Sequence, residues 1–446
     1  MLQIALSLCG TEVKLSSSLQ SCVRFHHSPL HLASHFCHFG RPTKKGATRT
    51  GCILLKTYGT VGFSAVDGRK RLFLMRITLE RSNLLKALNH VHRVVERRNT
   101  IPILSNVLLK ADGASLDMKA TDLDLEVTES IPAQVEQAGA TTVPAHLLYD
   151  IVRKLSDGSE VLLATSTDGA TMTVASGRSK FSLQCLPQSD FPDLTAGTFA
   201  NTFKIKAADL KMLIDRTQFA ISTEETRYYL NGIFLHTVDA AGDLKLRAVA
   251  TDGHRLARAD IVAPSGAEGM PGIIIPRKTV GEIQKLVDAP DAMISFEVSD
   301  AKIRLTFGTI VLTSKLIDGT FPDYQRVIPT GNDKEMRVDC QSFAQAVDRV
   351  STISSERGRA VKLALSDSQL TLTVNNPDSG SATEEIAVGY DYDPMEIGFN
   401  ARYLLDITSQ LTGTDAIFML ADAGSPTLVR DTAGDDALYV LMPMRV

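Results

Sequence analysis

The sequence predicts an α+β fold in which one domain, two helices packed on antiparallel sheets, is repeated three times in tandem. A strand-end motif recurs as TDLDLEVTESI from Thr121, TDGHRLARADI from Thr251 and NNPDSGSATEEIAV from Asn375. A helix-start segment follows each copy after 22, 24 and 24 residues, at Val143, Ile275 and Phe399. The copies recur after 130 and 124 residues, which is a domain length and too long for a solenoid repeat.

Further landmarks keep the same period. FSLQCLPQSDFPD, which contains Phe191, matches LTSKLIDGTFPDY, which contains Phe321, 130 residues later, and the third copy stops at YVLMPMRV. Several landmarks in one order are not expected by chance. We therefore expect three domains, with the boundaries 75–198, 199–329 and 330–446.

Each unit is expected to begin with an amphipathic helix and to contain a second one. One helical face of the first unit carries apolar residues at helical spacing, namely Leu84, Leu85, Leu88, Val91 and Val95. The second unit repeats the pattern with Leu210, Leu213, Ile214 and Thr217. The six predicted helical windows are 79–98, 145–155, 206–220, 276–288, 341–359 and 401–412.

Between the helices the apolar residues alternate, as they do in half-buried strands. Asp-Gly pairs at Gly113, Gly158 and Gly169 separate these runs, and such pairs favour hairpin turns. We expect about eight short antiparallel strands in each unit. Core packing is the default role of their apolar residues.

Composition divides the chain at Met75. Residues 1–74 hold ten Lys or Arg, two acids, five of the ten histidines and four of the six cysteines, whereas residues 75–446 carry a net charge of −12. His26, His27, His31, Cys37 and His38 lack the spacing of a zinc finger. A targeting peptide is one interpretation of this basic leader. An upstream-start translation, disordered or not made, is the interpretation we favour.

The remaining composition indicates a multi-domain protein without a membrane segment. The chain has 446 residues and is 44% hydrophobic, and no stretch reaches the roughly 20 apolar residues that a membrane helix needs. Outside the leader only Cys185 and Cys340 remain, which fits a reducing cytoplasm.

The predicted helices are basic although the chain is acidic. The six windows hold 17 Lys or Arg and 10 Asp or Glu, a net of +7, so the rest of residues 75–446 holds −19. A basic helix face is usually just solvated. The same bias over six helices instead suggests that a polyanion passes over them.

The sequence gives little support to two other classes of protein, an enzyme and a sequence-specific DNA-binding regulator. Thr251, Asp252, His254 and Arg255 form a possible acid/base cluster, and Asp122 with Asp124 is a possible carboxylate pair. Neither set comes with a nucleophile or a metal-ligand partner, and there is no GxxxxGK[ST] or GxGxxG motif, so no catalytic residue, cofactor or metal is predicted. A sequence-specific regulator is disfavoured, because no recognition-helix unit stands out.

ATDGHRLA, IPRK, LNG, TSKLIDGTFPDY, NNP and the terminal VLMPMRV closely resemble the bacterial sliding clamp, the beta subunit of DNA polymerase III. The resemblance spans essentially all of residues 75–446. It implies tandem DNA-clamp domains in a head-to-tail homodimeric ring, with helices lining the hole and sheets forming the rim. The ring would encircle duplex DNA without sequence preference and tether the replicative polymerase in the cytoplasm.

The resemblance also implies DNA-facing residues. Phosphate contacts carry no base information, and retention on DNA would come from the closed ring. The candidates are Lys86, Arg93, Arg97, Arg98, Lys211, Arg216, Arg227, Tyr228, Tyr229, Lys278, Lys285 and Arg349. For the two tyrosines, strand packing is an equal alternative.

The family's ring closes when an edge strand of the first domain pairs with one of the third domain in the other subunit. On the first strand the corresponding residues are Arg178, Lys180, Phe181 and Leu183. The other side would include Ile353, Glu384 and Glu385. Basic residues would thus meet acidic ones around an apolar centre.

A groove on the outer face would bind short peptides from the polymerase alpha subunit, the clamp loader and other clamp-binding proteins. The groove maps onto Leu230, Thr251, Gly253, His254, Arg255, Leu256, Pro322, Arg326, Val327, Asn400, Tyr403, Val440, Met442, Pro443, Met444 and Arg445. The chain departs from the family pattern at SERGRA around Gly358, where an aromatic residue can stand, and ends in Val446, where leucine is also common.

Overall fold

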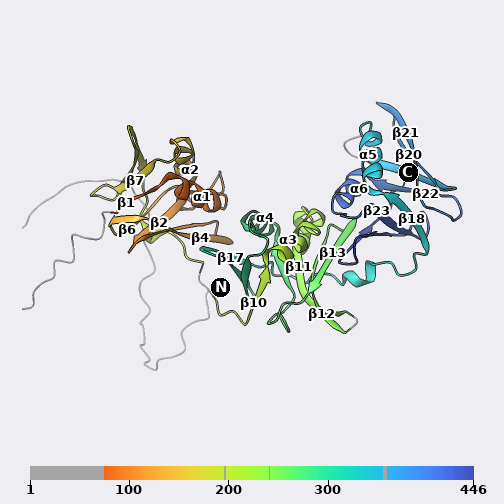
Figure 1. Cartoon of the computed structure of the whole chain (residues 1–446), viewed down its shortest axis with the longest axis horizontal. Coiled ribbons are helices and arrows are strands. Elements are labelled where there is room, and N and C mark those ends of the chain that lie inside the picture. The colour runs from red at the N-terminus through yellow and green to blue at the C-terminus, as the bar shows by residue number, and fades with distance from the viewer. Residues whose placement is uncertain (1–74, 195–196, 241, 355–358, 446) are drawn as a thin grey trace, which may run out of the picture. The chain divides into compact units, whose positions relative to one another are not determined.

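The computed structural model describes residues 75–194, 197–240, 242–354 and 359–445. The expectations for residues 1–74 and for the Gly358 region lie outside these ranges. In the described residues the same unit occurs three times, each time with two α-helices (Figure 1). The first repeat has nine strands and the other two have eight each, so the expectation of about eight strands holds with one extra strand.

The first repeat contains β1 (Arg76–Glu80), α1 (Arg81–Val91), β2 (Asn106–Asp112), β3 (Ser115–Thr121), β4 (Leu125–Pro132), β5 (Gln134–Gln137), β6 (Gly139–Pro144), α2 (Ala145–Lys154), β7 (Glu160–Thr165), β8 (Thr171–Ser176) and β9 (Ser179–Gln184). The second contains β10 (Asn201–Lys206), α3 (Ala207–Asp215), β11 (Gly232–Ala240), β12 (Asp243–Thr251), β13 (Arg255–Val262), β14 (Ile273–Pro276), α4 (Arg277–Leu286), β15 (Met293–Val298), β16 (Lys302–Phe307) and β17 (Ile310–Lys315). The third contains β18 (Lys334–Asp339), α5 (Cys340–Ser351), β19 (Ala360–Ser366), β20 (Gln369–Asn376), β21 (Gly380–Ala387), β22 (Met395–Asn400), α6 (Ala401–Thr408), β23 (Asp415–Leu420), β24 (Thr427–Asp431) and β25 (Ala437–Leu441).

Two eight-stranded sheets are each shared by two repeats. One has the order β10-β15-β16-β17-β4-β3-β2-β6, and the other has the order β14-β11-β12-β13-β25-β24-β23-β18. The first repeat keeps a five-stranded sheet, β5-β1-β7-β8-β9, and the third keeps a four-stranded sheet, β21-β20-β19-β22. Neighbouring repeats are therefore joined by the antiparallel pairs β4·β17, here called the first junction, and β13·β25, the second junction.

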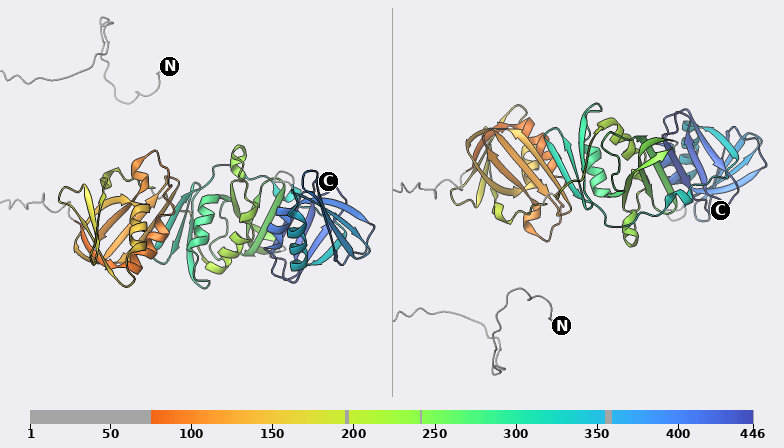
Figure 2. Two further views of the ribbon diagram at one scale, coloured as in Figure 1. Left: turned by 90° about the horizontal axis from the view of Figure 1, so that it is seen from above. Right: turned by 90° about the horizontal axis from the view of Figure 1, so that it is seen from below.

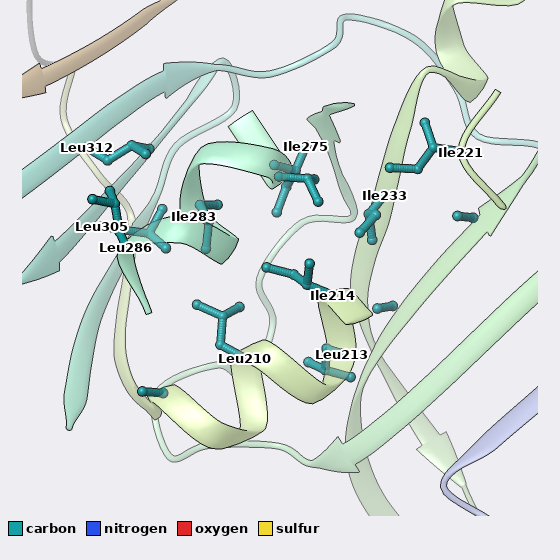
Figure 3. Packing of buried hydrophobic residues seen from close by; sticks show 14 of the residues in the cluster. Leu210, Leu213, Ile214, Ile221, Ile233, Ile275, Ile283, Leu286, Leu305 and Leu312 are labelled. Atoms are coloured by element: carbon teal, nitrogen blue, oxygen red, sulfur yellow. The ribbon is translucent and has the colours of Figure 1, made fainter. Parts of the chain in front are cut away.

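The two helices of each repeat pack on each other and on the sheets, as the second repeat shows (Figures 2 and 3). Leu210 and Ile214 of α3 point toward α4, which contributes Ile283 and Leu286, and all four side chains are buried. Burying one such side chain stabilises the fold by about 1.5–3 kcal/mol relative to leaving it exposed. The amphipathic pattern of these helices is thus used for packing.

Local sequence signals explain where elements begin and turn. Asp339 and Asn400 precede α5 and α6, and their side chains accept hydrogen bonds from the backbone N–H groups of Ser342 and Arg402 at 2.7 and 3.0 Å. Gly113, Gly158 and Gly169 have φ values of 57°, 69° and 72°, the left-handed conformation that favours glycine. The predicted hairpin turns are confirmed at Gly113 (β2–β3) and Gly169 (β7–β8), but the prediction is wrong for Gly158, whose turn joins helix α2 to strand β7.

The predicted helical windows are too long. α1 ends at Val91, and residues 92–98 form turns, although Val94 and Val95 are buried as a helical pattern requires. The six α-helices hold ten Lys or Arg and six Asp or Glu, so the net charge is +4 instead of +7. Within the described residues, no helix is long and apolar enough to cross a membrane.

Candidate functional site

An apolar pocket of about 330 Å³ lies at the second junction. The ends of β13 and β25 form one part of its wall, and the segments before β11 and after β17 form the rest. Nine predicted groove residues line it: Leu230, Thr251, Gly253, Arg255, Leu256, Pro322, Val327, Val440 and Met442. The central part of the predicted groove is therefore a real cavity.

A hydrophobic cluster separate from the main core supports this pocket. It contains Leu230, Val249, Leu256, Ile274, Phe321, Tyr324, Leu428, Leu438 and Val440, all buried. Phe321 stacks on Phe234 with ring centroids 4.8 Å apart, which holds the segment after β17 against the sheet. Val327 and Met442 remain 51% and 41% exposed, so the apolar lining is open to a ligand.

Arg255 fixes the pocket to the third repeat. Its guanidinium pairs with Asp252 at 3.1 Å and with Asp406 of α6 at 2.5 Å, and its side chain is 8% exposed. The guanidinium also lies 4.2 Å from the ring centroid of Tyr403. A buried cation requires partners of this kind, so Arg255 is a structural connection as well as a lining residue.

A second, polar pocket of about 360 Å³ adjoins the first and shares Arg227 and Arg255 with it. Two further predicted groove residues, His254 and Tyr403, line this polar pocket. Burial, followed by the charge of Asp252, raises the pKa of Tyr403. The two pockets together extend the site beyond the apolar part.

Five predicted groove residues line neither pocket: Arg326, Asn400, Pro443, Met444 and Arg445. Asn400 caps α6, and the backbone N–H of Met444 donates to the carbonyl of Gly398 at 2.8 Å. Arg326 is exposed and pairs with Asp323 at 2.8 Å. These residues border the pockets or support their walls.

Sequence reasoning missed several lining residues. Asp323 and Tyr324 line the apolar pocket, and the available signal was the recurring FPD motif, which contains Asp323 and directly precedes Tyr324. Arg227 and Tyr229, which were assigned to DNA, also line the pocket. Tyr228 and Tyr229 both lie in a 3-10 segment, η4 (Glu225–Leu230), and not in a strand, although Tyr229 does pack against the hydrophobic cluster of the pocket.

The possible acid/base residues are used in turns. The Asp122 carboxylate accepts from the backbone N–H groups of Asp124 and Leu125 at 2.9 and 2.7 Å. Asp252 accepts in the same way from His254 and Arg255, at 2.9 and 3.0 Å. Both aspartates close a tight turn before a strand.

The predicted DNA-facing cations differ in their exposure and in whether their side chains already have hydrogen-bond or ion-pair partners. Lys86, Arg97 and Arg98 are exposed, and among the described residues their side chains have no hydrogen-bond or ion-pair partner. Lys211 pairs with Asp215, Lys285 with Glu282, Arg349 with Glu384 and Arg227 with Glu224, while Arg93 donates to Asn89. Arg216 caps α3 and is half-buried, and Tyr228 is 54% exposed.

Lys278 is engaged at the first junction. Its ammonium lies 2.6 Å from Asp122, also pairs with Glu96, and donates to the carbonyl of Val94 at 3.2 Å. Burial alone would lower the pKa of Lys278, but the hydrogen bonds with Asp122 and Glu96 raise it. The neighbouring Arg277 is exposed and lines an open hollow along α4, so it is the freer cation at this helix start.

Two strands that carry predicted interface residues have a free edge. β9 and β21 are terminal strands of their sheets, and each pairs on one side only. Arg178, Lys180 and Phe181 are exposed, whereas Leu183 is buried. Glu385 lies exposed on β21, and Ile353 and Glu384 are half-buried.

Comparison with known proteins identifies the repeats. Family models of the DNA polymerase III beta subunit match residues 75–195 (N-terminal domain), 204–323 (central domain) and 325–445 (C-terminal domain). The beta sliding clamp of Caulobacter vibrioides (strain NA1000 / CB15N) is 54% identical over 372 residues, which is 83% of this chain and 100% of the relative. That of Escherichia coli (strain K12) is 40% identical over 375 residues, with the same two coverages.

Solved structures agree. A DNA polymerase III beta sliding clamp from Bartonella birtlesii, bound to griselimycin, has 60% identity and a TM-score of 0.82, and the match covers 84% of this chain and 100% of that one. A Pseudomonas aeruginosa clamp bound to griselimycin has 39% identity and a TM-score of 0.78, over 83% and 100%. The chain therefore belongs to the bacterial beta sliding clamps, the non-catalytic DNA polymerase III subunits that form a ring on DNA and tether the polymerase.

Proposed function

We propose that the three repeats, with the boundaries 75–198, 199–329 and 330–446, form half of a ring that closes by pairing β9 of one protomer with β21 of its partner. One observation carries this proposal. At both junctions within the chain, the last strand of a repeat (β17 or β25) pairs with the strand that follows the recurring turn motif of the preceding repeat (β4 or β13). The two strands left over from this scheme are β9 and β21, and both have free edges.

The junctions within the chain also predict the register between protomers. Leu312 pairs with Val127 at the first junction, and Tyr439 pairs with Ala257 at the second. The corresponding inward positions on β9 and β21 are Phe181, which faces Val174 across its hairpin, and Ala382, which faces Val374. Phe181 opposite Ala382 places Arg178 opposite Glu385, two exposed and oppositely charged residues.

Exposure supports this register. Leu312 and Tyr439 are fully buried, whereas Phe181 at the same position is 38% exposed. On α2, Leu147 is 49% exposed, whereas Thr279 at the matching position of α4 is 1% exposed. A partner strand on β9 would cover both apolar side chains, so we add Leu147 to the predicted interface of Arg178, Lys180, Phe181, Leu183, Ile353, Glu384 and Glu385.

The interface test uses the full chain. Phe181→Glu is expected to convert the dimer into a monomer in analytical ultracentrifugation, because it places a carboxylate in the apolar centre. Arg178→Glu is expected to weaken the dimer, and Glu385→Arg in the same chain to restore it. A Phe181→Glu protein that remains a dimer, or a double variant no better than the single one, would contradict the pairing.

The peptide groove is proposed to consist of the apolar pocket and the adjoining polar pocket. Griselimycin, which is bound to the Bartonella and Pseudomonas clamps, is the probe. Val327→Asp is expected to weaken its binding at least tenfold in calorimetry, since the substitution puts a charge on the open wall. Val262→Asp is the matched control, because Val262 is 71% exposed and lines neither pocket. Equal effects of the two variants would exclude this pocket.

For DNA, Lys86, Arg97 and Arg98 support the proposal best, because they are exposed and unpaired among the described residues. Loss of one phosphate contact lowers the salt slope of binding by about one. Arg98→Ala is therefore expected to weaken DNA binding and to lower the salt slope by about one. Lys110→Ala, on strand β2, removes the same charge and is expected to leave both the affinity and the slope unchanged. Wild-type protein loaded on nicked circular DNA is expected to stay there and to leave once that DNA is cut.

We also propose a cytoplasmic location. Cys185 and Cys340 are both free, as is usual for thiols in a reducing compartment. Fractionation of cells is the direct measurement, and recovery of the protein in a secreted fraction would contradict it.

A further inference from the structure

Beneath the peptide groove, four buried or half-buried polar side chains form a continuous chain of hydrogen bonds. Arg247 and Asp260 form a two-point ion pair, with N–O distances of 2.7 and 2.8 Å. Nη1 of Arg247 donates to the hydroxyl of Tyr324 at 3.2 Å, and Nε2 of His236 lies 3.1 Å from the same hydroxyl. Tyr324 is the member that lines the groove.

The direction of each hydrogen bond follows from chemistry. Nδ1 of His236 lies 3.1 Å from the carbonyl of Thr237, which can only accept, so Nδ1 carries the proton. In a neutral imidazole Nε2 is then an acceptor. Because the Tyr324 oxygen accepts from Arg247, its own proton is free to be donated to His236. Each of these hydrogen bonds therefore has one donor and one acceptor.

The charges nearby favour this arrangement. Burial, and then the positive charge of Arg247, lower the pKa of His236, while the hydrogen bond to Thr237 and the charge of Asp260 oppose them. Burial opposes the charge of Arg247, but its hydrogen bond with Asp260 raises the pKa well above the usual value. The neutral histidine and the charged arginine are thus both the favoured forms near neutral pH.

Among the residues that the structure describes, the first junction has no counterpart of this chain of hydrogen bonds. The FPD motif recurs there, but Leu194 stands where Tyr324 stands at the second junction. Leu194 is held only by its backbone N–H, which donates to Glu126 at 3.2 Å. Tyr324 is 6% exposed, and its hydroxyl is bonded to two residues that line neither pocket, so these bonds hold the side chain in place.

We infer that His236, Arg247 and Asp260 are positioning residues that hold the Tyr324 ring as a rigid wall of the peptide groove and thereby set the affinity for groove ligands. The inference rests on the proposed groove. It assigns a role in ligand binding to three side chains that line neither pocket. A preformed wall raises affinity because less conformational freedom is lost on binding.

The test measures griselimycin binding to full-length variants by calorimetry at pH 7.5. Tyr324→Phe keeps the ring but removes the hydroxyl, and is expected to weaken binding about fivefold, the effect of one lost hydrogen bond. His236→Phe is expected to act in the same direction. His236→Gln keeps an acceptor near Nε2, so its affinity should stay within about twofold of wild type.

Tyr390→Phe is the matched control. Tyr390 is also buried, and its hydroxyl donates one hydrogen bond, to the carbonyl of Asp393 at 2.7 Å, but it lies in the third repeat and lines neither pocket. A general loss of stability would affect Tyr324→Phe and Tyr390→Phe alike. A role in positioning the groove wall affects only the former.

A pH series separates positioning from packing. Protonated His236 cannot accept from Tyr324, so wild-type affinity should fall as the pH drops through the lowered pKa, that is, below 6.5. This fall should be absent in His236→Gln, which retains every residue that lines the two pockets. Identical pH profiles would overturn the inference.

The outcomes distinguish the inference from the groove itself. If Val327→Asp loses griselimycin but Tyr324→Phe and His236→Phe bind it like wild type, the groove stands and the positioning role is refuted. If Val327→Asp also binds normally, the proposed groove is wrong.

Discussion

At the second junction, Leu256 of β13 lies opposite Val440 of β25, and both side chains line the apolar pocket. The same ladder position of the first junction holds Glu126 opposite Thr313. Both of these residues line an open hollow of about 660 Å³ that also includes Lys119, Asp193 and Arg304. The backbone pairing is thus repeated, while the side chains on one face differ in polarity.

The difference separates two tasks of the sheet. Main-chain hydrogen bonds join neighbouring repeats at both junctions and do not depend on side-chain polarity. The outward side chains then decide whether the junction binds an apolar ligand. At the first junction Lys119 pairs with Asp193 and lies 3.6 Å from Glu126, and these charged groups fill the place of the apolar floor. The strand pairing between repeats therefore recurs along the chain, whereas the apolar pocket belongs to the second junction.

The largest effect on stability and on ligand binding is expected when Leu256 of the second junction is replaced by glutamate, the residue at the same position of the first junction (Glu126). Leu256 is 2% exposed, so Leu256→Glu buries a carboxylate without a partner and should cost about 5 kcal/mol of stability. Griselimycin binding should be lost. Leu256→Met, which conserves volume, should cost less than about 1.5 kcal/mol. Denaturant unfolding and calorimetry measure both, and a Leu256→Glu protein that binds within tenfold of wild type would refute the floor assignment.

The next largest effect is a difference in stability between variants of two cations, Arg255 at the second junction and Lys278 at the first. The Arg255 side chain is 8% exposed and that of Lys278 is 36% exposed. Arg255→Ala leaves Asp252 and Asp406 without their buried partner and should cost about 3–5 kcal/mol. Lys278→Ala should cost about 1 kcal/mol or less, because solvent screens its pairs. Equal losses in urea unfolding would show that burial does not govern the difference.

A smaller effect is expected from pH at the first junction. Burial raises the pKa of Glu126 above its ordinary value of 4.5, although Lys119 opposes this. Burial by itself would lower the pKa of Lys119, but its interactions with Asp193 and Glu126 together raise it, so the charge of Lys119 is shared between two carboxylates and compensates Glu126 only in part. Burial is the largest influence on Glu126 and therefore sets the direction of its pKa shift.

The sign follows from proton linkage. The folded protein binds this proton more tightly than the unfolded chain does, so the stability from Glu126 is present below pH 4.5 and is lost as the pH rises through the raised value. Glu126→Gln lacks this loss. Its unfolding free energy should therefore rise relative to that of the wild type as the pH is raised from below 4.5 through the raised pKa of Glu126. A difference in unfolding free energy between Glu126→Gln and the wild type that does not change with pH would contradict the argument from burial.

The smallest effect concerns Tyr439 of β25. Its hydroxyl is buried and has no hydrogen-bond partner, and Leu312 at the same position of the first junction is apolar. Tyr439→Phe should therefore be neutral or stabilise by up to about 1 kcal/mol. The control is Tyr390→Phe, which removes a satisfied hydroxyl and should destabilise by a similar amount. Chemical denaturation of both variants measures the contrast.

The repeat and its turns could be predicted from sequence because their signals are local. Gly113 and the apolar spacing of Leu84 and Leu88 specify a turn and a helix face without reference to distant residues. The end of α1 could not be predicted in the same way. Val94 and Val95 are buried after the helix has ended, so apolar spacing records burial there and not helical geometry.

The site was predictable where residues share a motif and unpredictable where they meet across the chain. Thr251, Gly253 and Leu256 come from one turn and all line the pocket. Lys278 was assigned to DNA, but its partner Asp122 lies 156 residues earlier, and no local pattern indicates that pair. Tyr229 was likewise assigned by position along the chain, and only the folded η4 segment brings it to the groove.

The free edges β9 and β21 are unlike, and this gives the closed assembly a direction. In the proposed ring unlike edges join, so each protomer follows the other in the same sense around the hole, and the twofold axis runs along the threaded duplex. Both proposed peptide grooves would then open toward the same end of that axis. Two enzymes held at once would face the same way along the DNA, so the orientation in which the clamp is first placed decides which direction of synthesis it can serve.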